Sequence, residues 1–252
     1  TKAPLSITAN DDAKFYSLAD TAGYAGVRYN GFVGGETSAA LGGALVMTRN
    51  RTGLSGNATT DAATSYSNVL EPSGLTSSNY EITFNKGSYT IVPVGELLVK
   101  VADTTAIYGS TPTYNLTAAG YMTSTTVNSV TTYHVTDLLG LGYATVNGTQ
   151  VTVTDGAVTQ GSFTLGANSP ALSSSGTLKV GSYTVGATAI TTSSANFSNT
   201  INVVGAYDVT PKSVNTSATG VTKVYDGSTD ATDNRMATGG VMSGIDIREA
   251  GS

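Results

Sequence analysis

The chain has 252 residues, 39% of them hydrophobic, and a formal net charge of −5 at pH 7. The acidic balance and the lack of any Lys/Arg cluster exclude a surface built to bind phosphates, so no nucleic-acid partner is expected. The absence of cysteine excludes a disulfide framework and a thiol nucleophile. No apolar run approaches the ~20 residues of a membrane-spanning helix, so no membrane insertion is expected.

The composition favours β-structure. Only 12% of the residues are charged, Gly numbers 30, and much of the remainder is Thr, Ser, Val, Ala and Tyr. β-Branched and aromatic residues fit a pleated sheet, while Gly and Asn supply the positive-φ positions of turns. The first residues, TKAPLSITAND, lack the charged start and apolar middle of a signal peptide, and we interpret the chain as a piece of a longer polypeptide.

Alternating strands open and close two similar stretches of the chain. LSITANDDAKFYS (residues 5–17) parallels LVKVADTTAIYGS (98–110), and both run through a turn to a tyrosine. SSNYEITFNKGSYTIVP (77–93) parallels SSANFSNTINVVGAYDVTP (193–211), and the glycine in the middle of each predicts a β-hairpin. Between them, SAALGGALVM (38–47) predicts a tight turn or a short helical piece followed by a strand.

These similarities predict three copies of one module. The first covers residues 1–94, the second 95–211, and the third starts at 212 and is cut off at 252. Tyr225 in TKVYDGS takes the place of Tyr16 and Tyr108, and we interpret these three tyrosines as packing residues.

The second copy is longer than the first, and the excess lies in TYHVTDLLGLGYATVNGTQVTVTDG (132–156). Asn147-Gly148, between two alternating runs, is the strongest hairpin signal of the chain. If the second copy binds a ligand, we expect Tyr133, His134 and Tyr143 of this insertion to contact it.

The motifs SITANDDAKFY, YNGFVGGETSAALGG, PSGLTSSNYEITF and GSYTIVP resemble the MBG repeats of filamentous-haemagglutinin-like bacterial surface adhesins. VADTTAIYGSTPTYNLTAAGY in the second copy is similar to them, although its middle lacks the GFVGGET block, and KVYDGSTDAT resembles the start of the sister YDG repeat. The resemblance implies stalk or spacer modules of a long polypeptide that two-partner secretion exports to the surface of a Gram-negative bacterium. It implies no catalytic residues.

Metal and catalytic motifs are sparse. His134 is the only histidine, which argues against a Ser/His/Asp triad and a histidine-based zinc site. Calcium needs only oxygen ligands, and Asp226, Ser228 and Asp230 alternate as in half of a calcium loop. No glutamate closes that loop, and turn formation explains the same residues. We therefore expect no enzyme and no cofactor, with calcium as the open alternative.

Six sequons are candidate glycosylation sites, although a chain rich in Thr and Ser generates such triplets by chance. Their asparagines are Asn50, Asn57, Asn115, Asn147, Asn196 and Asn215.

The sequence predicts an all-β chain of tandem small, mainly antiparallel β-sandwich or half-barrel modules, with room for one short helix per module, arranged as an elongated rod. The predicted function is a non-catalytic stalk in a secreted adhesin that supports attachment, aggregation or biofilm formation. The alternative is a glycan- or protein-binding module with its recognition surface on the second repeat, and a polysaccharide-acting hydrolase is the third. The expected partners are other repeats of the same polypeptide, a host or matrix glycan or protein, or a second adhesin chain.

Overall fold

The computed structural model describes residues 1–54, 56–156 and 158–213. Almost every regular element is a β-strand, so the predicted all-β class is confirmed. The strands are β1 (Ala3–Ala9), β2 (Asp12–Phe15), β3 (Val27–Asn30), β4 (Gly42–Arg49), β5 (Ser65–Thr76), β6 (Tyr80–Asn85), β7 (Gly87–Val92), β8 (Leu97–Val101), β9 (Thr104–Ile107), β10 (Leu116–Val127), β11 (Val130–Asp137), β12 (Ala144–Asn147), β13 (Gln150–Thr154), β14 (Thr159–Ala167), β15 (Gly181–Thr192), β16 (Ile201–Val204) and β17 (Ala206–Thr210).

Helix is limited to single 3-10 turns. These are η1 (Ser38–Ala40) and η2 (Ala58–Thr60), and η1 leads directly into β4, as the sequence predicts for this stretch. In the second half of the chain, Leu138–Gly142 forms a turn in which Gly142 N donates to Leu139 O. Glycines at 140 and 142 keep that segment from extending into a helix.

The strands form four sheets in two units. The first unit (β1–β7) contains sheet A, in the order β3-β1-β6, and sheet B, in the order β2-β7-β5-β4. The second unit (β8–β17) contains sheet C, in the order β11-β10-β8-β16, and sheet D, in the order β12-β13-β14-β15-β17-β9. Within the described residues each strand pairs only with strands of its own unit, and most of the pairs are antiparallel.

Both units are built on the same parallel pairings. In the first, β1 pairs with β6 and β2 with β7; in the second, β8 pairs with β16 and β9 with β17. Each unit therefore consists of an opening and a closing chain segment that lie side by side, and each segment passes from one sheet into the other.

The predicted hairpins at residues 77–93 and 193–211 are wrong. β6 belongs to sheet A and β7 to sheet B, so they do not pair, and β16 and β17 are likewise in different sheets. A glycine is needed at each of these points because the backbone passes close to the backbone of a distant strand; it does not form a turn. A Cβ on Gly87 would lie 2.8 Å from the Ala9 carbonyl oxygen, and one on Gly205 would lie 2.9 Å from that of Val101.

The insertion of the second unit adds strands at sheet edges. β11 extends sheet C beyond β10, while β12 and β13 extend sheet D beyond β14. The predicted hairpin is confirmed: Asn147 pairs with Gln150 across a two-residue loop, and Gly148 takes a φ of 61°. A glycine with positive φ at the first loop position matches the twist of the two strands.

The two units differ in their interiors. The second has one large apolar cluster that includes Leu97, Val151 and Phe163. The first has two small clusters, around Leu5 and around Tyr89, beside a group of buried charges. Tyr16 and Tyr108 are half-buried against these clusters, as expected of packing residues. Tyr225 lies outside the described residues.

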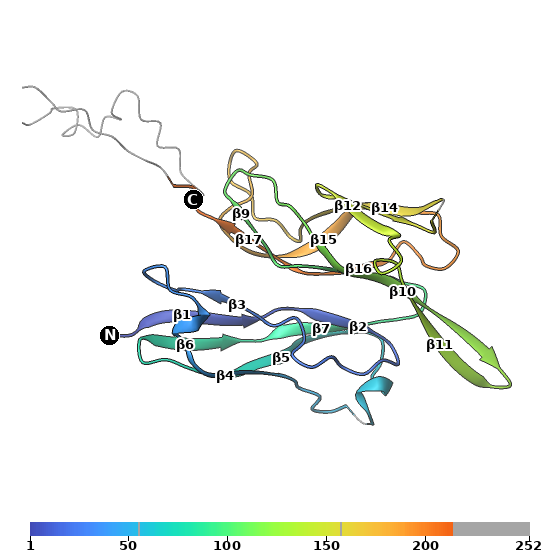
Figure 1. Ribbon diagram of the computed structural model, residues 1–252, viewed down its shortest axis with the longest axis horizontal. Coiled ribbons are helices and arrows are strands. Elements are labelled where there is room, and N and C mark those ends of the chain that lie inside the picture. The colour runs from blue at the N-terminus through green and yellow to red at the C-terminus, as the bar shows by residue number, and fades with distance from the viewer. Residues whose placement is uncertain (55, 157, 214–252) are drawn as a thin grey trace, which may run out of the picture.

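The two units lie side by side (Figure 1). Sheet C of the second unit packs on sheet B of the first, through an apolar cluster that joins Ala13, Phe15 and Val92 to Leu98, Met122 and Val204. This side-by-side arrangement of the two units does not show the elongated rod that the sequence predicts.

Candidate functional site

The surface around the added strands is where the alternative function, ligand binding by the second copy, would place its contacts. β10 and β11 form a ribbon that projects from the second unit (Figure 1), with Val127 and Val130 at its tip 61% and 64% exposed. Tyr133 and His134 are both exposed on β11. Because neighbouring side chains of a strand point to opposite faces, these two cannot contact one ligand on the same face.

Tyr133 already has a partner in the first unit. Its ring centroid lies 5.3 Å from that of Tyr16, with an edge-to-face angle of 75°. Such pairs contribute about 0.5–1.5 kcal/mol beyond their buried area. Part of the inserted strand β11 therefore joins the two units.

Tyr143 lies elsewhere, in a small cavity of about 80 Å³ that it lines with Tyr121, Phe197 and Asn196. The ring centroids of Tyr121 and Phe197, which both line this cavity, are 5.3 Å apart. A volume of this size holds a few water molecules and no drug-sized ligand. The structure thus separates Tyr143 from Tyr133 and His134.

The described sequon asparagines are all exposed. They are Asn50, Asn57, Asn115, Asn147 and Asn196. Their exposure leaves glycosylation open as a prediction. Asn215 and the calcium candidates Asp226, Ser228 and Asp230 lie outside the described residues. Within those residues, no three His, Asp or Glu side chains gather closely enough to hold a metal ion.

The first unit contains a group of buried charges that the sequence pattern does not predict. Arg49 and Asp61 have side chains only 1% exposed and lie 2.5 Å apart (Nη2 to Oδ2), and the Arg49 guanidinium sits 4.9 Å above the Tyr89 ring. Asp61 also binds Arg51, and Asp20 binds both Arg49 and Lys14. The spacing along the chain gave no signal for this group, because its members lie on β2, β4 and loops.

This network is electrostatically satisfied. Hydrogen bonds from Arg51, together with those from Arg49, lower the pKa of Asp61 to about 2. Burial alone raises the pKa of Asp20, but the hydrogen bonds from Lys14 and Arg49 bring it below its usual value. A general acid or base needs a pKa near the working pH. These carboxylates therefore stay ionised and serve to hold loops against the sheet.

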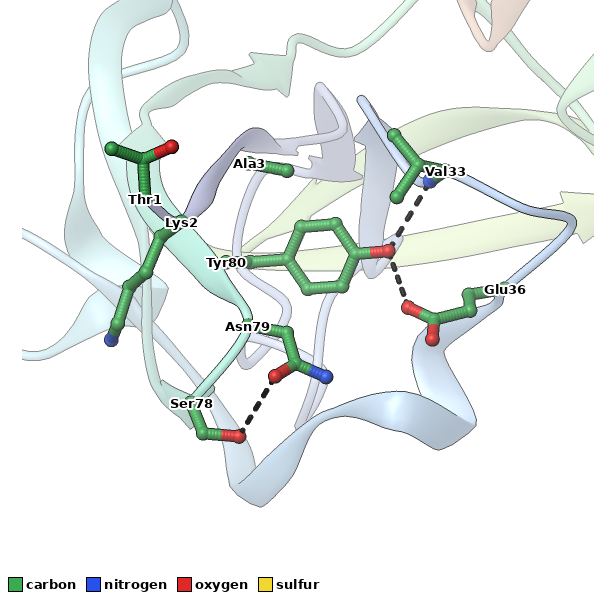
Figure 2. A pocket seen from close by; sticks show the side chains of 8 residues that line it. All are labelled: Thr1, Lys2, Ala3, Val33, Glu36, Ser78, Asn79 and Tyr80. Carbon is green, nitrogen blue, oxygen red and sulfur yellow. Dashed lines mark hydrogen bonds between the residues drawn. The ribbon is translucent and has the colours of Figure 1, made fainter.

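An open hollow lies at the end of the first unit (Figure 2). Its volume is about 570 Å³, and its wall includes Lys2, Glu36, Asn79 and Tyr80. The Tyr80 hydroxyl donates to Glu36 and accepts from Val33 N at 3.2 Å. The hydrogen bond to Glu36 fixes the loop around that residue over the end of sheet A, and it raises the pKa of Tyr80. The polar groups nearest to the ring are thus committed to one another.

Polar contacts flank the apolar junction between the units. Lys100 Nζ donates to Asp12 Oδ1 at 2.6 Å, and Asn10 Nδ2 donates to Asp103 Oδ2 at 2.6 Å. These bonds link positions that are far apart in the sequence and fix how one unit sits on the other.

A scan against protein-family models places a known domain in this chain. The MBG domain (YGX type) matches residues 5–90. Residues 5–90 are an MBG domain. It spans β1 through most of β7, which includes both parallel pairings of the first unit and its buried charges. The predicted resemblance of residues 5–90 to the MBG family is thereby confirmed.

The MBG match does not extend to the second unit. Searches of curated proteins and of solved structures found no match to the chain. None of the helices in the described residues is long and apolar enough to cross a membrane.

Proposed function

We propose that this chain is a non-catalytic repeat region of a secreted bacterial surface adhesin, which supports attachment, aggregation or biofilm formation. The observation that carries the proposal is the MBG domain at residues 5–90, a domain type compatible with adhesin repeats. On this proposal the chain lies on the surface of a Gram-negative bacterium and its first partners are other repeats of its own polypeptide.

The second unit supports the repeat interpretation. It has the same two parallel pairings as the MBG domain, and Gly205 makes the same close backbone approach as Gly87. Tyr183 pairs with Tyr207 as Tyr66 pairs with Tyr89. We therefore propose residues 95–211 as a second MBG-like repeat, followed from 212 by the start of a YDG-type repeat.

The proposal is tested on the cells that make the protein. An antibody raised against the full chain should label intact cells, and protease added outside should remove the label. Deleting the coding region of residues 1–252 from its gene should weaken attachment or aggregation. Recovery of the antigen from the cytosol alone, with none on intact cells, would contradict the proposal.

Recognition of a glycan or protein by the second unit is the alternative function. The exposed ribbon of β10 and β11, with Val130 and His134 at its surface, favours it. Binding of the full chain to a glycan array, lost in Val130→Ser or His134→Ala and kept in the exposed first-unit variant Leu18→Ala, would favour this alternative over a spacer.

A further inference from the structure

The contact between the two units has an approximate two-fold character. Sheets A and C are equivalent in their pairings, and so are sheets B and D. Sheet C packs on sheet B, and sheet A faces sheet D across a groove. The same face of each unit is therefore turned toward the other, which produces two equivalent halves of one interface.

The two halves differ in chemistry. In the half between B and C, Leu98, Val204 and Val92 are buried together. Strand register puts Ser6 at the place of Leu98, Asn85 at that of Val204, and Thr210 at that of Val92. The half between A and D thus carries polar residues where its equivalent is apolar.

The polar half stays open as a groove of about 290 Å³. Alternation along the strands turns the even-numbered residues outward, because Leu5 and Ile7 of β1 point into the core. The outward strand side chains that line the groove are therefore polar on both walls: Ser6, Thr8, Arg28 and Asn30 from sheet A, and Ser182, Asp208 and Thr210 from sheet D. Val180, just before β15, adds one exposed apolar side chain to the lining.

Two charged groups on these walls have hydrogen-bonding capacity left over in the part of the chain that the structure describes. Asp208 Oδ1 is buried and accepts no hydrogen bond. Arg28, on the opposite wall, makes no hydrogen bond or ion pair among the contacts of the described residues, although its charge also acts on Asp103, where it partly offsets the rise in the pKa of that carboxyl caused by burial. A buried polar atom without a hydrogen bond destabilises the fold, so a ligand that donates to Asp208 Oδ1 would recover that free energy.

We propose that this groove binds a neutral saccharide. A sugar hydroxyl donates and accepts at the same time, so one ring offers a donor to Asp208 and an acceptor to Arg28, with further bonds to the hydroxyl and amide side chains. An anion would pair with Arg28 but would be repelled by the Asp208 carboxylate. A cation would pair with Asp208 but would be repelled by Arg28. The groove also lies at a junction between units and near the lower end of the ~300–1,000 Å³ range of ligand pockets.

The test uses the full ¹⁵N-labelled chain, titrated with glucose, galactose, N-acetylglucosamine and lactose at millimolar concentrations. At least one sugar should shift the backbone amides of Arg28, Ser182 and Thr210. Asp208→Asn and Arg28→Ala should each weaken that binding about tenfold, because each removes a charged partner of the ligand. Ser182→Phe should block the groove and abolish it.

Thr125→Ala, on the exposed ribbon of β10, is the matched control and should bind like the unmodified chain. Amide spectra of every variant establish that it is folded. The proposal is overturned if no sugar shifts the groove amides, if the three groove variants bind unchanged, or if inorganic phosphate shifts these amides at lower concentration than any sugar. Such a failure would leave the proposed spacer function intact, because surface location and attachment are measured separately.

Discussion

Lys100 Nζ lies 2.6 Å from Asp12 Oδ1, and this ion pair joins the second unit to the MBG domain. The Asp12 side chain is 4% exposed and the Lys100 side chain 27%, so the pair sits at the edge of the buried junction. Asp12 Oδ1 also accepts from Ala13 N at 2.7 Å. The lysine thus neutralises a carboxylate that the apolar junction would otherwise leave alone.

Replacing Lys100 should loosen the junction. In Lys100→Met the buried Asp12 carboxylate keeps only a backbone partner, and the free energy of unfolding should fall by about 1–3 kcal/mol. Urea denaturation measures this, and limited proteolysis at the linker between Val92 and Leu97 should speed up. Lys86→Met breaks the exposed pair with Glu71 and should change neither readout noticeably. Equal effects of the two variants would argue against a junction role.

The apolar half of the junction should be costly to truncate. Met122 is fully buried among Leu98, Phe15 and Val204. Met122→Ala should lower the free energy of unfolding by about 2–5 kcal/mol, because it opens a cavity between the units. Val127→Ala on the same strand is the control, since Val127 is 61% exposed and its loss should cost less than about 0.5 kcal/mol. A small effect at Met122 would mean that the units separate readily.

The MBG domain should lose stability in acid. The pKa of Asp61 is about 2 in the folded chain, against 3.8 for the free group. A lowered pKa stabilises the fold above the unfolded value, and that contribution is lost as the pH falls from about 4 to 2. The urea midpoint should therefore drop over this interval. Asp61→Asn should be less stable at pH 7, by about 3 kcal/mol, since Arg49 is left buried without it, and its midpoint should depend less on pH.

The two sheet-switching glycines should tolerate no side chain. Gly87→Ala places a Cβ 2.8 Å from Ala9 O, and Gly205→Ala places one 2.9 Å from Val101 O. Each new methyl group would push two neighbouring backbone segments apart. Both substitutions should therefore lower the free energy of unfolding by about 1–3 kcal/mol, measured by thermal unfolding. Gly166→Ala in β14 is the control, because a Cβ there meets nothing within 4 Å. A neutral Gly205→Ala would show that the second unit does not depend on this crossing.

Local features of the chain were predictable because they depend on neighbouring residues. Alternation of Leu5 and Ile7 with polar residues identifies β1, and Asn147-Gly148 identifies the inserted hairpin. The glycines at 87 and 205 misled the prediction, because a glycine between two alternating runs has the same pattern in a turn and in a strand that changes sheets. Only the backbone of a distant strand distinguishes the two cases.

The candidate site shows the same limit. Tyr133, His134 and Tyr143 share one insertion, yet the pleat of β11 puts Tyr133 and His134 on opposite faces, and Tyr143 lies in a separate cavity. Arg28 and Asp208 gave no signal in the sequence, because they are brought to one groove by the packing of two units.

Composition, period-two alternation and turn residues are local properties, and they were enough to predict the all-β class, the MBG motifs of the first copy and the position of the insertion. Which strands pair in parallel, where each chain segment changes sheets and which outward faces meet depend on contacts between distant residues and became known only from the fold. Alternation assigns a residue to one face of a strand, but it does not say what covers that face. For this reason Ser6 and Leu98, at equivalent places in the two units, line a polar groove in one case and an apolar junction in the other.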